Sequence, residues 1–160
     1  MRNEAIIYRA IKNNDLKSLS DFINQHGVNA PVDDGTCPHQ ALFRNNIDAV
    51  KFLLEKKADP NALYKQGYTA LIEAIDRQYW VIARLLIQYG ADVTLKDEKN
   101  NSPLIKAILR FNGDNSLIEL LLKKGADPWE ELVPGYTPMN LAQNMGIKPL
   151  LLDLINKTKL

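Results

Sequence analysis

A six-residue motif recurs four times along the chain at a nearly constant interval, and this repetition constrains the fold more than any other feature. The motif occupies residues 36–41 (TCPHQA), 69–74 (TALIEA), 102–107 (SPLIKA) and 137–142 (TPMNLA), whose starts lie 33, 33 and 35 residues apart. A second motif, at residues 57–60, 90–93 and 125–128, trails the first three copies by 21 to 23 residues. A period of this length predicts a linear array of similar units, each packed against its neighbours.

The order of residues within one unit predicts two helices joined by a turn. The leading Thr or Ser is a favoured N-cap residue, and the Pro that often follows suits the first helical turn. Apolar residues such as Ile82, Leu85 and Leu86 then recur at helical spacing, and we expect Leu85 and Leu86 to be buried between units. Gly90 is expected to end this second helix by adopting a left-handed conformation.

The motif and its 33-residue period resemble the T-P-L-H-x-A signature of the ankyrin-repeat family. The resemblance implies an all-α fold, an ankyrin-repeat solenoid of about five stacked helix-turn-helix units with loop fingers. The expected domain is single, with units at residues 1–33 (N-terminal cap), 34–66, 67–99, 100–134 and 135–160 (C-terminal cap). The family histidine is present only as His39, and Lys57 replaces a helix-ending glycine. Two extra residues near Phe111 should lengthen the first helix of the fourth unit or the loop after it.

The charge and composition of the chain argue against some classes of binding partner. The chain carries 20 Lys and Arg against 19 Asp and Glu, spread evenly over both halves, which argues against a dedicated nucleic-acid surface. No run approaches the roughly 18–20 apolar residues of a membrane span, and no targeting segment is recognisable. Cys37 is the single cysteine, which fits a reducing compartment. We therefore expect a cytoplasmic protein, monomeric on its own, without nucleic-acid or membrane partners.

Residues with catalytic chemistry are sparse. His26 and His39 belong to different units and do not follow metal-ligand spacing, so we expect no metal and no cofactor. Asp92 and Asp127 both follow Gly-Ala, and this repetition indicates a structural turn. Cys37 stands at a helix N-terminus, which can lower the pKa of a thiol. A thiol-dependent enzyme is accordingly kept as a remote alternative, and no catalytic residue is predicted.

The resemblance implies that a partner binds the concave face formed by first helices and loop tips. Arg44, Arg77 and Arg110 lie 33 residues apart and hold the same position in three units, so they are expected to form a row that attracts an acidic partner. Asp76 is expected to neutralise Arg77 in part. The other interpretation of the row is coincidence at a solvent-exposed position. The predicted partner-binding residues are Phe43, Arg44, Tyr64, Lys65, Gln66, Tyr68, Asp76, Arg77, Lys99, Leu109, Arg110, Phe111, Tyr136 and Met145.

The resemblance therefore implies a non-enzymatic protein-binding module, either an adaptor or a stoichiometric inhibitor of a partner protein. The richness in Asn, Ile and Lys suggests an AT-rich genome, which leaves open a bacterial immunity protein that neutralises a cognate toxin, or a host-directed ankyrin effector. A nucleic-acid-binding protein that uses the arginine row is a further class, and the near-zero net charge argues against it.

Overall fold

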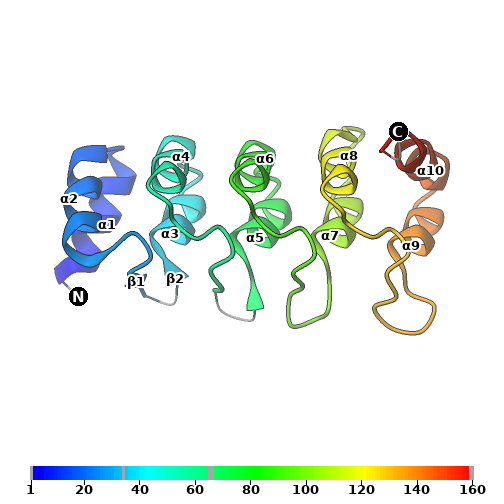
Figure 1. Cartoon of the computed structure of the whole chain (residues 1–160), viewed down its shortest axis with the longest axis horizontal. Helices are drawn as coiled ribbons and strands as arrows, with labels where there is room; N and C mark the ends of the chain where they lie inside the picture. The colour runs from blue at the N-terminus through cyan, green and yellow to red at the C-terminus, as the bar shows by residue number, and fades with distance from the viewer. Residues whose placement is uncertain (1, 34, 65–66, 159–160) are drawn as a thin grey trace.

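The computed structural model describes residues 2–33, 35–64 and 67–158, and these form a single row of helix pairs with the two termini at opposite ends (Figure 1). Five pairs follow one another: α1 (Arg2–Lys12) with α2 (Leu16–His26), α3 (Cys37–Phe43) with α4 (Ile47–Glu55), α5 (Ala70–Asp76) with α6 (Trp80–Gln88), α7 (Pro103–Leu109) with α8 (Ser116–Lys123), and α9 (Pro138–Asn144) with α10 (Lys148–Thr158). The expected all-α solenoid is confirmed.

Loops project from one side of the row and form the expected fingers (Figure 1). In the first finger, β1 (Pro31–Val32) pairs antiparallel with β2 (Gly35–Thr36), and these are the only strands in the described residues. Two of the three later fingers are closed by single pairings, between Leu63 and Thr69 and between Val133 and Tyr136. Strand content is therefore confined to the finger stems.

The hydroxyl at the start of each repeated motif begins a first helix, as the sequence predicts. The side chain of Thr69 accepts a hydrogen bond from the Ile72 amide at 3.3 Å, and Thr137 accepts one from Asn140 at 3.1 Å. At Thr36 the arrangement includes the histidine, because the Thr36 amide donates to His39 Nδ1 at 3.3 Å. These bonds satisfy amides that have no partner inside the helix.

The second helices end in left-handed residues. Gly90 has φ 92° and Gly125 has φ 96°, and Lys57 adopts φ 68° at the same place in its unit. A residue with a Cβ atom is strained by about 1–2 kcal/mol in this conformation. The lysine therefore keeps the geometry of the repeat at a local energetic cost.

The core runs along the row between the helix pairs. Ile82 and Leu86 are fully buried there, and Ala41 and Ala74 are buried on the first helices, where their small size allows close stacking. The expected burial of Leu85 is wrong in degree, because this side chain is half-buried and packs at the edge of the core. Leu85 directly precedes Leu86 in α6, so its side chain is rotated about the helix axis away from the buried face that carries Ile82 and Leu86.

The extra residues of the fourth unit lengthen a loop and not a helix. Helices α5 and α7 both contain seven residues. The connection from α7 to α8 spans residues 110–115, whereas the connection from α5 to α6 spans only residues 77–79. The insertion therefore enlarges the turn next to Arg110.

Polar contacts at the base of the fingers link the first unit to the second and the second to the third. Asn29 Oδ1 accepts the Asp59 amide at 2.8 Å, and Asn61 Oδ1 accepts the Asp92 amide at 2.7 Å. Asp92 in turn accepts the amide of Thr94 at 2.8 Å, and Asp127 does the same with Trp129. The repeated aspartates are thus structural, as the sequence indicates, because each one accepts a backbone amide two residues later in its turn.

Candidate functional site

One surface of the molecule, which we call the first-helix face, is formed by the C-terminal ends of α1, α3, α5, α7 and α9 and by the adjoining fingers. Arg44, Arg77 and Arg110 directly follow α3, α5 and α7, where each is the C-cap residue. All three side chains are exposed. The structure therefore places the arginines at equivalent points of three successive units.

Each arginine contacts the unit before it, but the contacts differ. The Arg77 guanidinium lies 5.2 Å from the centre of the Phe43 ring, and Arg110 Nη2 lies 3.2 Å from Asp76 Oδ1. Arg44 stands 4.6 Å from the centre of the Tyr8 ring. Cationic groups at such distances are attracted to the faces of aromatic rings.

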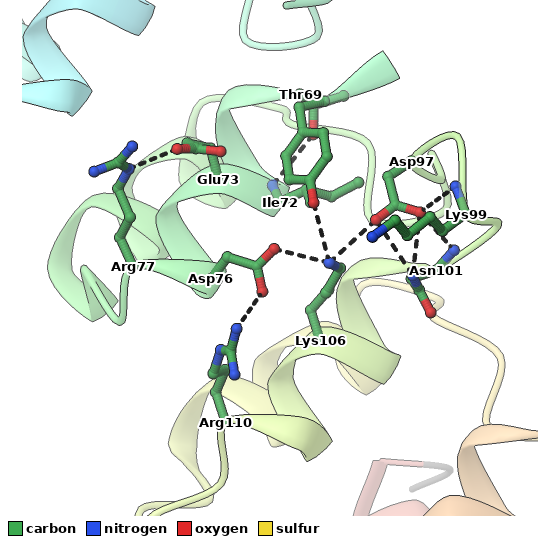
Figure 2. Close-up of polar contacts among 11 residues, drawn as sticks. Thr69, Ile72, Glu73, Asp76, Arg77, Asp97, Lys99, Asn101, Lys106 and Arg110 are labelled. Carbon is green, nitrogen blue, oxygen red and sulfur yellow. Dashed lines mark hydrogen bonds and ion pairs between the residues drawn. The ribbon is translucent and has the colours of Figure 1, made fainter. Parts of the chain in front are cut away.

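The expectation that Asp76 neutralises Arg77 is wrong. Arg77 Nε instead contacts Glu73 Oε1 at 2.5 Å, one helical turn earlier on α5. Asp76 points away from Arg77 and toward α7, as Figure 2 shows. The geometry follows from helix periodicity, since residues four apart share a face and adjacent residues do not.

Lys106 is the centre of a buried ionic cluster that joins two units (Figure 2). Its Nζ lies 2.8 Å from Asp76 Oδ2 and 3.1 Å from Asp97 Oδ2. The Tyr68 hydroxyl is 3.4 Å from the same nitrogen. The side chain of Asp97 is 0% exposed and that of Lys106 is 10% exposed, so both charges are largely removed from water. We call Asp76, Asp97 and Lys106 the Lys106 cluster.

In the Lys106 cluster, burial and hydrogen bonding have opposite effects on the pKa values of Lys106 and Asp97, and the hydrogen bonds and ion pairs together have the larger effect. Burial alone would lower the pKa of Lys106, but its bonds to Asp76 and Asp97 raise that pKa above the ordinary range. Burial alone would raise the pKa of Asp97, but bonds from the Asn101 backbone and from Lys106 hold it below its usual value. Lys106 and Asp97 are therefore both charged at neutral pH.

An aromatic cluster lies next to it, toward the N-terminus. Tyr64 stacks on His39 with ring centres 5.5 Å apart and meets the Phe43 ring edge-on at 5.0 Å. Both Tyr64 and Phe43 are half-buried. These two predicted partner-binding residues therefore serve packing inside the molecule and present only part of their surface outward.

The side chains of the remaining predicted site residues differ in how exposed they are. Leu109 is 43% exposed and Met145 is 39% exposed, each at the C-terminal end of a first helix. Lys99 is exposed in the third finger, whereas Phe111 and Tyr136 pack against the core. Lys65 and Gln66 lie outside the described residues.

Cys37 and His39, two residues of types used in catalysis, are not accessible. Cys37 is fully buried, and burial raises the pKa of its thiol to about 11. His39 is also buried, and burial lowers its pKa to about 4, so it is neutral at pH 7. A low-pKa, exposed thiol is what nucleophilic chemistry requires. The Cys37 environment is the opposite, which removes the support for a thiol-dependent enzyme.

Metal-binding clusters and membrane-crossing helices are both absent from residues 2–33, 35–64 and 67–158. None of these residues forms a group of three or more His, Cys, Asp or Glu side chains that could hold a metal ion. In that same part of the chain, no helix combines the length and the apolar character that crossing a bilayer requires.

Sequence reasoning missed Lys106, Asp97 and Glu73. Lys106 and Glu73 occupy the variable position x of the repeated motif, and Gln40 is their equivalent in the second unit. Three polar residues at one position just before the buried alanine were a signal that this position faces a polar environment between units. Asp97 carried no comparable signal, because the equivalent finger residue in the preceding unit is Tyr64.

The chain is similar to known repeat proteins along most of its length. The family model for ankyrin repeats (three copies) matches residues 7–97. A probable 26S proteasome regulatory subunit p28 of Saccharomyces cerevisiae is 36% identical over 141 residues, which is 84% of this chain and 60% of that protein. BCL-6 corepressor-like protein 1 of Homo sapiens is 36% identical over 107 residues, 66% of this chain and 6% of that protein.

A third relative comes from a virus. A putative ankyrin repeat protein of Fowlpox virus is 34% identical over 104 residues, 64% of this chain and 17% of that protein. The chain thus spans 60% or less of the length of these three relatives.

Proposed function

This chain belongs to the ankyrin-repeat family, whose repeats form protein–protein interaction modules, and we propose that it acts as a non-enzymatic adaptor that binds another protein through its first-helix face. The observation that carries the proposal is the repeated exposure of Arg44, Arg77 and Arg110 at the ends of first helices whose other residues are mostly buried. Arginine in such a setting is frequently a dominant binding residue.

The scaffold beneath these side chains supports the proposal. The Lys106 cluster joins α5, α7 and the third finger, and the Asn29 and Asn61 bonds connect further neighbours. A surface held in one geometry loses little conformational entropy on binding. Leu109 and Met145 add exposed apolar area beside the arginine positions.

An adaptor is favoured over an inhibitor by the yeast relative, which is named as a regulatory subunit of the 26S proteasome. A subunit of an assembly contacts other proteins and needs no chemistry of its own. We place the module in a reducing compartment such as the cytoplasm, because Cys37 is a free buried thiol. A monomeric state is part of the proposal and is checked by light scattering.

The proposal is tested by recovering partners from cells of the source organism with the tagged chain, followed by cross-linking of the purified pair. The triple variant Arg44→Gln, Arg77→Gln, Arg110→Gln removes three charges from the first-helix face. A matched control, Lys51→Gln, Lys123→Gln, Lys124→Gln, removes three charges from exposed positions in α4 and at the end of α8.

We expect the arginine variant to lose binding while the lysine variant retains it, with helical circular dichroism unchanged in both. Equal weakening by both variants would attribute the effect to net charge and contradict the assignment of this face. Recovery of no specific protein would contradict the proposed function itself.

A further inference from the structure

We propose that the first-helix face receives an acidic side chain of its protein partner at one place, on Arg44 and Lys12 near the N-terminal end of the row. This inference rests on the proposed function and deepens it, because it names where the partner's charge is bound and which arginines do not bind it.

The three equivalent arginines differ in the residue one helical turn before them. Arg44 is preceded by Gln40, Arg77 by Glu73 and Arg110 by Lys106, always at a spacing of four. Residues four apart share one helix face, so this neighbour sets the local charge. The neighbour is neutral at Arg44, negative at Arg77 and positive at Arg110.

The negative and positive cases are both compensated inside the molecule. Glu73 pairs with Arg77 at 2.5 Å. Lys106 and Arg110 are matched by Asp76, which contacts both, and by Asp97 (Figure 2). A partner carboxylate that approached Arg77 or Arg110 would therefore meet an acidic group already bound there, and like charges repel.

Arg44 has no such compensation among the described carboxylates. It lies over the Tyr8 ring and donates one hydrogen bond, from Nη1 to the Gln40 carbonyl at 3.4 Å. The positive charge of Arg44 is thus unbalanced.

Lys12 brings a second cation to the same place. Arg44, Lys12, Ile11 and Asn46 line one hollow between the ends of α1 and α3. Both cationic side chains are exposed. The Asn46 side-chain amide donates to the Ile11 carbonyl at 2.6 Å, so the free donors of the hollow come from Arg44 and Lys12.

The geometry favours a carboxylate as the group bound. An arginine has five N–H donors in a planar fork, and a ring beneath its face leaves the edges of that fork open. Two parallel N–H groups match the two oxygens of an Asp or Glu side chain. Lys12 then adds a point charge beside the pair.

The test is an NMR titration of the isotope-labelled chain at low ionic strength, where exposed charge pairs are least screened. The probe is a capped hexapeptide of alternating Gly and Glu, and the control probe carries Gln in place of Glu. The side-chain Nε–Hε signals of Arg44, Arg77 and Arg110 are followed separately. Inorganic phosphate is titrated as a second anion.

We expect the acidic peptide to shift the Arg44 signal and to leave Arg77 and Arg110 nearly unmoved. Arg44→Gln should weaken peptide binding about tenfold, the loss of a charge-assisted contact, and Lys12→Gln should weaken it less. The matched variant Lys51→Gln, which removes one exposed cation from α4, should bind as the unmodified chain does.

Several results would overturn the inference: equal shifts at Arg77 or Arg110, no shift at Arg44, an equal response to the Gln peptide, or tighter binding of phosphate than of the acidic peptide at Arg44. A recovered partner that binds Arg44→Gln like the unmodified chain would also overturn it, while leaving the proposed function intact. Failure to recover any partner would contradict only the proposed function.

Discussion

Replacing Lys106 by Met should destabilise the protein more than removing the charge of any exposed residue on the first-helix face. The substitution keeps most of the length of the side chain and deletes its ammonium. Asp97, whose side chain is 0% exposed, and Asp76, at 17%, would then face each other without the cation that lies 3.1 Å and 2.8 Å from them.

The structure limits the size of this effect. Removing one member of a buried ion pair costs about 3–5 kcal/mol, because the remaining charge is left uncompensated. Asp97 keeps hydrogen bonds from the amides of Lys99 and Asn101, both at 2.9 Å, and Asp76 keeps Arg110. We therefore expect a loss near the lower end of that range, about 3 kcal/mol.

Urea denaturation followed by circular dichroism measures the loss, read as a shift of the midpoint at constant slope. Lys123→Met is the control, because its pair with Glu119 at 2.6 Å is exposed and should contribute less than about 1 kcal/mol. Adding Asp97→Asn to Lys106→Met keeps an oxygen that can accept the turn amides and should restore part of the loss.

A Lys106→Met variant that is no less stable than Lys123→Met would refute the reasoning, as would a double variant whose loss equals the sum of the two single losses. Additivity would mean that the two side chains do not interact.

The other predictions concern titration, packing, backbone strain and thiol access. The pKa of Asp97 is lower in the folded protein than its ordinary value of 3.8, so Asp97 stabilises the fold above pH 3.8, and this stability is lost as the pH falls through the folded pKa. The pKa of Lys106 is higher in the folded protein than its ordinary value of 10.5, so Lys106 stabilises the fold below pH 10.5, and this stability is lost as the pH rises through the folded pKa. Urea midpoints should therefore be highest between pH 3.8 and pH 10.5. Leu86→Ala should cost about 2–5 kcal/mol in the same assay, and Leu85→Ala about 1 kcal/mol, because only Leu86 is fully buried. Lys57→Gly should raise the free energy of unfolding by about 0.5 kcal/mol. It removes roughly 1–2 kcal/mol of left-handed strain, which exceeds the cost of about 0.5–1 kcal/mol from the greater freedom of glycine in the unfolded chain. A lower urea midpoint would contradict this. Cys37 should react with iodoacetamide only after denaturation, and fast modification of the native protein would show that the thiol is accessible.

The sequence predicted the fold because the repeat constrains each unit several times over. Thr69 and Ser102 cap helices, Gly90 ends one, and the alanines at 41 and 74 are buried, as expected from residue type and spacing alone. The degree of burial of Leu85 was not predictable in this way, because adjacent apolar residues on a helix differ only in rotation about its axis. The place of the two extra residues was equally open, because a helix and a loop can each absorb an insertion of that size.

The candidate site was predicted less well, for a physical reason. The repeat gave the positions of Arg44, Arg77 and Arg110, but charge compensation depends on contacts between units 30 to 34 residues apart, such as Lys106 with Asp76 and Arg110 with Asp76. A one-dimensional pattern shows that residues share a position and not which of them meet. The chain neighbour Asp76 therefore looked like the partner of Arg77, whereas Glu73 is.

The Lys106 cluster also limits how this array can change by gain or loss of whole repeats. Deleting residues 67–99 would keep the 33-residue register and bring the fourth unit onto the second. Phe43 would then stand where Asp76 stands, and Tyr64 where Asp97 stands, because these residues are 33 positions apart. Lys106 would be buried against two aromatic rings with no carboxylate. Recombination that keeps the 33-residue register would therefore preserve the backbone of the array. The Lys106 cluster, however, is kept only when the third and fourth units are inherited together.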